Sequence, residues 1–320
     1  MKLLVVSRID ASALARLRAE HDVVVEFDAA PGRLRRLLAD REVLILRSGV
    51  EVGPDVLDRA PRLRLVLRAG SGFDNIDLED LARRGIAFEH VPAPGAQSVA
   101  ELTFALMLAL ARNILAADRS MRAGSWRKSE LVGHMLAGKT LGVVGLGTIG
   151  ARVARMGHAW GMQPVGCVER PTAARAAQFA RQGIRLTDLD DVLGSGDFVT
   201  VHVPLQASTA GLLNRQSLRL LKPSAFLVNA SRGGVVDEAA LHEALRAGHI
   251  AGAGLDVHLV EADGHTSPLA ELDNVVLTPH IGGSTADAQR EIGLEVVRIV
   301  TALAAHANGH AAMADANVEG

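Results

Sequence analysis

The sequence predicts an α/β protein made of two parallel-sheet units, each with helices covering both faces of its sheet. Three observations lead to this fold class. Short apolar segments alternate with helical ones along most of the chain, which is the rhythm of parallel strands joined by crossover helices. These segments form two series, which the proline-rich turn Val91–Gly95 separates. The length of 320 residues is also too great for one domain of ordinary size.

The first series contains short strands rich in Leu and β-branched residues. The expected strands are Leu3–Val6, Val23–Glu26, Val43–Leu46 and Leu65–Leu67. The segments between them have helical patterns at Ser12–Glu20, Gly32–Ala39 and Asp55–Arg59. Strands that are apolar throughout are typical of a sheet buried on both faces.

A second series of strands begins near residue 140. The strands expected there are Thr140–Val144, Gln163–Val168, Phe198–His202, Ala225–Asn229, Gly254–Val257 and Val275–Thr278. Their spacing leaves room for crossover helices. One long helix, Gln97–Arg122, is expected between the two series, and a last helix, about Thr285–Ala304, is expected after the second.

The composition limits the classes of function. The net charge is −2, Lys and Arg form no runs, and aromatic residues are only 3%, so no nucleic-acid partner is expected. The single cysteine, Cys167, excludes an internal disulfide framework and fits a reducing compartment. The most apolar window, Leu102–Ala111, is far shorter than the ~20 residues of a membrane span. Because Arg8 and Asp10 interrupt the apolar N-terminus, we expect no export signal, no membrane attachment and a cytoplasmic location.

A glycine-rich turn, GLGTIG at Gly145–Gly150, follows the expected strand Thr140–Val144 and opens a helical segment. In such a context Gly145 permits a tight turn, Gly147 lets the backbone approach a pyrophosphate, and Gly150 lets the helix pack closely on the strand. The helix N-terminus then offers free N–H groups to the phosphates. The turn therefore predicts a dinucleotide site, with an ordinary strand-to-helix turn as the alternative.

The next strand of a dinucleotide fold ends in an acidic residue about 20 residues further on, which binds the ribose hydroxyls. Glu169 stands nineteen residues after Gly150. Its carboxylate would repel a 2′-phosphate, which favours NAD as the cofactor. Arg170 follows it and could pair with a 2′-phosphate, so NADP stays open as the alternative.

Three ionisable residues, Arg232, Glu261 and His280, follow apolar strands of the second series. The carboxyl ends of such strands form the crevice where ligands bind. An Arg fork binds a carboxylate, a His can take a hydroxyl proton near neutral pH, and a carboxylate beside it orients the ring. Each alone could be an ion-pair partner, a loop acid or a helix cap. Together, behind a dinucleotide turn, they predict hydride transfer between a nicotinamide and a small hydroxy or keto acid.

The remaining histidines and the cysteine carry weaker signals. His202 ends a strand of the second series and either lines the nicotinamide side of the site or is a structural histidine. No Cys/His cluster has the spacing of metal ligands, so no metal is expected.

Several motifs together resemble those of the D-isomer-specific 2-hydroxyacid dehydrogenases, and the members that oxidise D-3-phosphoglycerate are the most similar. The likeness covers the chain from about Val43 to Val297. The motifs are RAGSGFDNID at Arg68–Asp77, QSVAE at Gln97–Glu101, GLGTIG at Gly145–Gly150, HVPL at His202–Leu205, NASRGGVVDE at Asn229–Glu238, GLDV at Gly254–Val257 and HIGGSTADAQ at His280–Gln289.

The resemblance implies a flavodoxin-like substrate domain, residues 1–96 plus 288–320, and a Rossmann dinucleotide-binding domain, residues 97–287. It implies that Arg232 binds substrate, Glu261 supports the histidine and His280 is the acid/base. Substrate ligands would be Arg47, Ser71, Gly72 and Arg232. Cofactor ligands would be Gly145, Gly147, Thr148, Ile149, Gly150, Val168, Glu169, Arg170, His202, Val203, Pro204, Ala230, Ser231, Arg232, Asp256, His280, Gly282 and Gly283. Family members are homodimers or dimers of dimers, with the dimer contact on the helix that begins at Gln97.

Some positions depart from the family pattern. Val168 stands where the family has its ribose Asp, and Glu169 comes one place late. Arg47 and Arg68 match basic residues that lie near a substrate phosphate, but Glu51 replaces a Lys there, which puts phosphoglycerate in doubt. In two further departures, His258 replaces the usual Phe and Ala262 the Pro that follows the catalytic Glu.

The resemblance leaves three functions open. The first is oxidation of a D-2-hydroxy acid, with 3-phosphoglycerate as one candidate. The second is reduction of a small keto acid such as glyoxylate or hydroxypyruvate. The third is a non-catalytic NADH-binding sensor, similar to corepressors that keep the same Arg, Glu and His. Because the sequence ends near residue 320, a C-terminal serine-sensing domain and feedback inhibition by serine are not expected.

Overall fold

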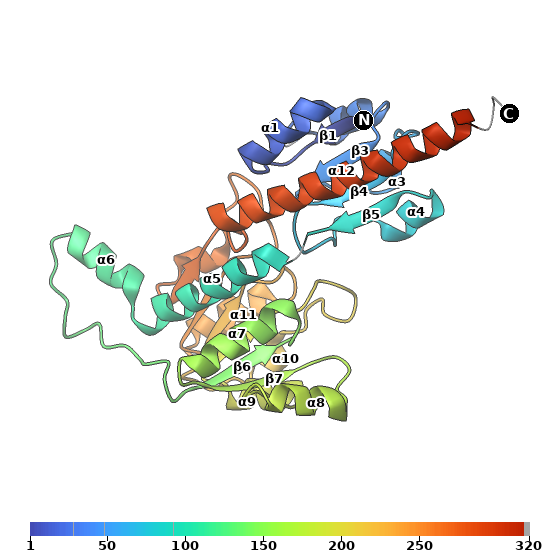
Figure 1. The fold of residues 1–320 in the computed structure, drawn as a ribbon. Helices are drawn as coiled ribbons and strands as arrows, with labels where there is room; N and C mark the ends of the chain where they lie inside the picture. Colours follow the sequence, from blue (N-terminus) through green and yellow to red (C-terminus); the bar gives the residue numbers. More distant parts are fainter. Residues whose placement is uncertain (28, 48, 92, 317–320) are drawn as a thin grey trace. The chain divides into compact units, whose positions relative to one another are not determined.

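The computed structural model describes residues 1–27, 29–47, 49–91 and 93–316, and the chain forms two compact units (Figure 1). Unit 1 comprises Met1–Gly95 and Gly283–Gly320, and unit 2 comprises Ala96–Gly282. The domain boundaries expected from the sequence lie close to these, after residues 96 and 287. Both units are parallel sheets covered by helices, which confirms the predicted α/β fold class.

Unit 1 is built on a five-stranded parallel sheet with the order β2-β1-β3-β4-β5. The strands are β1 (Lys2–Val5), β2 (Asp22–Val25), β3 (Val43–Leu46), β4 (Leu65–Arg68) and β5 (Ala87–His90). The order is flavodoxin-like, and it reverses between β1 and β3. Strand β5 was not predicted, because it lies at the sheet edge and alternates exposed with half-buried residues.

Helices cover both faces of this sheet because successive strand side chains point in opposite directions. Leu3 and Ile45 face α1 (Ala11–Glu20) and α12 (Ala286–Ala316), whereas Leu44 faces the other layer. That layer consists of α2 (Pro31–Leu38), α3 (Pro54–Leu57) and α4 (Leu78–Arg83). Figure 1 shows α12 running past α1. It is longer than the predicted helix, and its buried side chains, such as Val296, complete the core of unit 1.

Unit 2 is built on a seven-stranded parallel sheet with the order β12-β11-β10-β9-β6-β7-β8. The strands are β6 (Thr140–Val144), β7 (Gln163–Cys167), β8 (Arg185–Leu186), β9 (Phe198–Val201), β10 (Phe226–Asn229), β11 (Gly252–Leu255) and β12 (Val275–Leu277). This is the Rossmann order, extended by one strand, and it reverses between β6 and β9. Of the second series, only the two-residue strand β8 was not predicted.

Two helical layers sandwich the sheet of unit 2. The first layer contains α5 (Ala93–Ala111) and α7 (Thr148–Ala159), whose residues Met107 and Val153 share a core with Leu141 of β6. The opposite layer contains α9 (Leu189–Ser195) and α11 (Glu238–Arg246), which bury Leu193 and Leu241. The remaining helices are α6 (Ile114–Arg122), α8 (Ala173–Ala180), α10 (Arg215–Leu218) and the 3-10 helix η1 (Pro268–Glu271).

The helix expected at Gln97–Arg122 is in fact two helices, α5 and α6. The break follows from Asn113, which has a left-handed backbone with φ 53° and cannot continue an α-helix. By length and hydropathy, Pro94–Ala111 of α5 would suffice to cross a membrane, with a mean hydropathy of 1.3. However, 56% of this window is buried, as in the core helix of a folded domain.

Candidate active site

The strand register of unit 2 brings the predicted site residues to one edge of its sheet. Residues that pair with one another across six neighbouring strands are Cys167, Val144, Val201, Asn229, Leu255 and Leu277. The residues that follow them at the carboxyl edge are Val168, Gly145, His202, Ala230, Asp256 and Thr278. The loops that carry the predicted cofactor and catalytic residues of unit 2 therefore begin at the same edge of the sheet.

The glycine-rich turn between β6 and α7 has the geometry that its sequence predicts. Gly145 has φ 94°, and a Cβ there would lie 2.7 Å from the carbonyl oxygen of His202. A Cβ at Gly150 would lie 1.9 Å from the carbonyl oxygen of Gly145, so only glycine lets α7 start so close to the strand. At Gly147, in contrast, a Cβ would meet no atom within 4 Å in the part of the chain that the structure describes. No side chain of the described residues caps α7 at Gly147, which leaves helix N–H groups for an anion.

A cavity of about 1030 Å³ opens beside this turn. Its lining includes seven residues predicted to contact the cofactor, namely Gly145, Gly147, Val168, Glu169, His202, Val203 and Pro204. Thr148 and Ile149 form the first turn of α7. The volume, the open space at Gly147 and the uncapped helix fit a dinucleotide. The lining also includes Arg175 and Asp188. The sequence did not predict them, because only the packing of α8 on β8 and of α9 on β7 brings them to the cavity.

The acidic residue expected at the end of β7 lines this cavity. Glu169 is exposed there, two residues after the last residue of the strand. The Arg175 guanidinium donates a 3.4 Å hydrogen bond to the backbone carbonyl of Arg170. Thr172 caps α8 by accepting a hydrogen bond from the Arg175 backbone N–H. A carboxylate and a guanidinium therefore both lie where a ribose or a 2′-phosphate would be recognised.

His202 lines the dinucleotide cavity and is also hydrogen-bonded within the fold, while its place beside the nicotinamide stays a prediction. It lines the cavity, and its Nε2 lies 2.8 Å from the Thr200 hydroxyl. The residue retains some exposed surface, but its Nδ1 atom is buried and has no partner among the described residues. Burial lowers the pKa of His202 to about 3, so the ring is neutral at physiological pH.

The loop after β10 holds Arg232 through the buried Asn229. The side-chain oxygen Oδ1 of Asn229 accepts hydrogen bonds from the Ser231 N–H at 3.1 Å and from the Ser231 hydroxyl at 2.8 Å, and its side-chain Nδ2 donates to the Arg232 carbonyl at 3.0 Å. The Arg232 guanidinium donates to the Ser231 carbonyl at 2.7 Å. Ala230, another predicted cofactor contact, is the first residue after the strand and is buried. The loop around Arg232 is therefore fixed by its own backbone and side chains.

Asp256 anchors the loop that carries His280. Its side chain is only 1% exposed. One carboxylate oxygen accepts hydrogen bonds from the Thr278 hydroxyl at 2.6 Å and from the Ile281 N–H at 2.8 Å. The other accepts from the Gly282 N–H at 2.8 Å. Asp256 thus ties the ends of β11 and β12 together, and its contact with the cofactor stays a prediction.

His280 and Glu261 form a hydrogen-bonded pair. His280 Nδ1 lies 2.8 Å from Glu261 Oε2, and the side chains are 29% and 38% exposed. Partial burial opposes ionisation of Glu261, but the hydrogen bond and charge of His280, with the His258 N–H, hold the pKa of that carboxyl below its usual 4.5. The remaining His280 nitrogen, Nε2, is then the atom that can exchange a proton with a ligand.

The predicted site residues of unit 1 lie at the carboxyl edge of its own sheet. Arg47 follows β3 at the point where the strand order reverses, and its backbone N–H donates to the Ser7 hydroxyl at 2.9 Å. Burial lowers the pKa of its guanidinium. Ser71 and Gly72 lie in the loop after β4, where the Gly72 carbonyl accepts a 2.6 Å hydrogen bond from Arg68. Gly283 is assigned to unit 1, whereas the other predicted cofactor ligands belong to unit 2.

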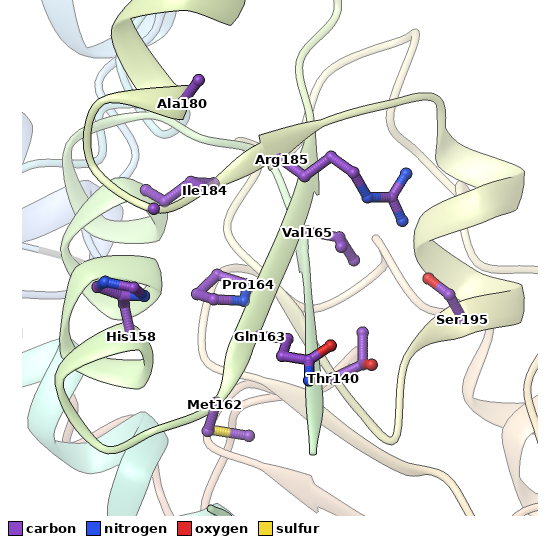
Figure 2. A pocket seen from close by; sticks show the side chains of 11 residues that line it. Thr140, His158, Met162, Gln163, Pro164, Val165, Ala180, Ile184, Arg185 and Ser195 are labelled. Carbon is purple, nitrogen blue, oxygen red and sulfur yellow. The ribbon is translucent and has the colours of Figure 1, made fainter. Parts of the chain in front are cut away.

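A second cavity of unit 2, of about 590 Å³, lies at the amino ends of β6 and β7 (Figure 2). Figure 2 shows His158 on one side of β7 and Arg185 and Ser195 on the other. The Arg185 guanidinium is already ion-paired with Asp191 at 2.6 Å. Because none of the predicted site residues lines this cavity, we place the candidate site at the carboxyl edge.

Comparison with known proteins agrees with this geometry. Residues 104–282 match the family model described as the D-isomer specific 2-hydroxyacid dehydrogenase, NAD binding domain. D-3-phosphoglycerate dehydrogenase from Mycobacterium tuberculosis is 42% identical over 300 residues, which are 93% of this chain but only 56% of that relative. The chain thus spans little more than half the length of that relative.

Two further relatives match over most of their own length. Hydroxypyruvate reductase from Thermotoga maritima is 41% identical over 267 residues, which are 82% of this chain and 85% of that protein. The solved structure of D-lactate dehydrogenase from Aquifex aeolicus, complexed with NAD and lactic acid, has a TM-score of 0.85 and 30% identity, covering 96% of each chain. The chain therefore belongs to the D-isomer-specific 2-hydroxyacid dehydrogenase family.

Proposed function

We propose that the protein is an NAD(P)-dependent oxidoreductase that interconverts a D-2-hydroxy acid and its 2-keto acid. The observation that carries this proposal is the His280–Glu261 pair, which stands on the same sheet edge as the dinucleotide cavity. A proton-transfer group beside a hydride carrier is what this reaction needs.

In the oxidation direction, His280 accepts the substrate hydroxyl proton at Nε2, while Glu261 holds the ring through Nδ1–H and stabilises the imidazolium that forms. Arg232 binds the substrate carboxylate through its guanidinium. The nicotinamide cofactor, when bound, supplies the acceptor or donor of the hydride. In unit 1, we propose Arg47 and the loop residues Ser71 and Gly72 as further substrate ligands.

For the substrate, we favour a small unphosphorylated keto acid of the glyoxylate or hydroxypyruvate type over 3-phosphoglycerate. Glu51 is exposed and adds a negative charge where a phosphate would need a positive one. Arg68, a second candidate phosphate ligand, is only 5% exposed, and its Nε donates to the Gly72 carbonyl. The hydroxypyruvate reductase relative also matches over most of its own length.

The test is oxidation of NADH and NADPH by the purified protein against glyoxylate, hydroxypyruvate, pyruvate, 2-oxoglutarate and 3-phosphohydroxypyruvate. We expect turnover of an unphosphorylated acid, and we expect His280→Ala to lower kcat by about 10²- to 10⁴-fold while the Kd for NADH stays within about twofold. A strong preference for the phosphorylated acid would make phosphoglycerate the substrate. Binding of NADH without turnover of any acid would identify a sensor instead.

We also propose NAD as the preferred cofactor, because Glu169 lines the cavity where the ribose would bind. The Kd for NADH should be lower than that for NADPH, and Glu169→Ser should reduce the ratio of the NADPH Kd to the NADH Kd. Arg175→Ala, which removes the guanidinium from the same cavity, is the variant for comparison. If the wild type preferred NADPH and Arg175→Ala abolished that preference, the arginine would be a 2′-phosphate ligand and the proposal would be wrong.

We infer that the segment Ile114–Met135 binds a second copy of this chain. Figure 1 shows it leaving the end of α5 and returning. The segment returns where the His134 N–H donates to the Ala111 carbonyl at 2.7 Å. Large apolar side chains are exposed along it, including Trp126 at 78% and Val132 at 79%. Such an apolar surface is typical of a homodimer interface. Trp126→Glu should yield a monomer in light scattering.

We also propose a cytoplasmic location for the protein.

A further inference from the structure

Residue 258 lies at the junction of the three loops that carry the proposed catalytic residues. Its backbone N–H donates to Glu261 Oε1 at 3.2 Å. Its backbone carbonyl packs against the loop of Arg232, where a Cβ at Gly233 would lie 1.9 Å from the His258 oxygen. Its ring nitrogen Nε2 lies 2.9 Å from the carbonyl oxygen of Thr278, two residues before His280.

The tautomer of His258 follows from its partners. A carbonyl oxygen can only accept, so Nε2 must carry the proton that it donates to Thr278. Nδ1 is buried and has no partner among the described residues, so a proton placed there would have no acceptor. The ring is therefore held by a single directed hydrogen bond, which Nε2–H donates to the Thr278 carbonyl.

The carbonyl that His258 holds is also the one that shapes the backbone of His280. The His280 N–H lies 3.1 Å from the Thr278 carbonyl and 2.8 Å from the Asp256 carbonyl. His280 itself has a left-handed φ of 53°. Without the His258 donor, the Thr278 carbonyl would lose its side-chain partner and the turn at His280 would lose one of its restraints.

We propose that His258 is a positioning residue for the His280–Glu261 pair, acting through the Thr278 carbonyl with its ring and through Glu261 with its backbone. This inference rests on the proposed function, since it concerns the same acid/base pair. It predicts that loss of the ring N–H affects proton transfer at His280 and changes the Kd for NADH little, because His258, Glu261 and Thr278 are not among the residues that line the dinucleotide cavity.

The test compares three replacements. His258→Phe keeps a ring of similar size without a donor, and Gln places an amide N–H at the same number of bonds as Nε2. Asn instead places it near the position of the unpartnered Nδ1. We expect Phe and Asn each to lower kcat by about three- to tenfold, with the Kd for NADH and the KM for the keto acid within about twofold, and Gln to recover most of the loss. His249→Phe, at the amino end of β11, should have no effect on kcat.

A spectroscopic measurement separates this inference from the proposed function. In ¹⁵N-labelled protein, His258 should show the Nε2–H tautomer, and the low-field proton of His280 Nδ1–H should persist in His258→Gln but broaden or vanish in His258→Phe. These signals are read without substrate, so they decide the inference even if the wild type turns over no acid. An Nδ1–H tautomer, a full kcat in His258→Phe, or equal losses in Gln and Phe would overturn it.

Discussion

His280 Nδ1 lies 2.8 Å from Glu261 Oε2, although the two residues come from loops after different strands. The contact depends on a left-handed backbone at His280, a conformation that costs a non-glycine residue on the order of 1 kcal/mol or more. Hydrogen bonds from the loop to the buried Asp256 offset this cost. The acid/base pair is therefore preorganised by the fold before any ligand binds.

Removing the charge of Glu261 should impair catalysis without removing its hydrogen bond. In Glu261→Gln the imidazolium keeps an acceptor but loses the negative charge beside it. We expect the transition state to lose about 1.5–3 kcal/mol of stabilisation, which lowers kcat by about 10- to 150-fold. Because the pKa of Glu261 is held below 4.5, the carboxylate is lost only as the pH falls below that value. The Glu261 carboxylate of the wild type should thus stay ionised from pH 8 to pH 5, so its own protonation should add no pH dependence to kcat in that range. An unchanged kcat in the variant would remove Glu261 from the mechanism.

The sequence predicted those features of the fold that residues close together in the chain determine. The turn Gly145–Gly150 and the apolar strands before it are fixed by neighbours in the chain, and the structure has them where expected. The proximity of His280 and Glu261 was expected only because carboxyl ends of parallel strands share an edge. The backbone register across the sheet turns that general rule into a specific alignment.

Other features depend on contacts between distant segments and left no clear local signal. In the sequence Asp256 is only the acid of the GLDV motif. In the structure its carboxylate accepts hydrogen bonds from the segment Thr278–Gly282, which follows β12. Arg175 reaches the dinucleotide cavity only because α8 packs beside β8. The break at Asn113 was missed because the residues on both sides of it favour a helix.

Alanine at two glycines of the dinucleotide turn should separate binding from folding. Gly147→Ala adds a methyl group into open space, so we expect unchanged thermal stability but a Kd for NADH raised about tenfold, since the added methyl keeps the pyrophosphate from the backbone. Gly150→Ala forces a Cβ against the Gly145 carbonyl, so stability should fall by about 1–3 kcal/mol. Calorimetry and NADH fluorescence measure both quantities. Unchanged NADH affinity in Gly147→Ala would exclude the pyrophosphate from this turn.

The buried ring of His202 should make the protein acid-sensitive in a defined range. Its pKa is about 3 in the folded chain and near 6.5 when unfolded, so the unfolded chain alone takes up a proton between these values. Stability is therefore full above pH 6.5 and falls as the pH decreases towards 3, by up to about 2 kcal/mol between pH 6.5 and 5. Urea unfolding should show a smaller decrease for His202→Gln. Replacement of the exposed His265 by Gln should leave the pH dependence of the unfolding free energy as in the wild type. If this free energy changed equally with pH in all three proteins, His202 would not be the source of the acid sensitivity.

Reversing the charge of Glu51 should move substrate preference towards phosphorylated acids. Glu51 is exposed and shares its loop with Arg47, which lies at the strand reversal of unit 1. Because exposed charge pairs contribute about 0.2–1 kcal/mol each, Glu51→Lys should raise kcat/KM for 3-phosphohydroxypyruvate by about three- to tenfold. The value for hydroxypyruvate serves as an internal control and should hardly change. For Glu51→Gln, kcat/KM for 3-phosphohydroxypyruvate should lie between the values for the wild type and Glu51→Lys. Because exposed charges are screened, 0.5 M salt should reduce the differences in kcat/KM among the three proteins. Equal effects of Lys on both substrates would mean that Glu51 lies away from the phosphate, and the preference for unphosphorylated acids would then need another cause.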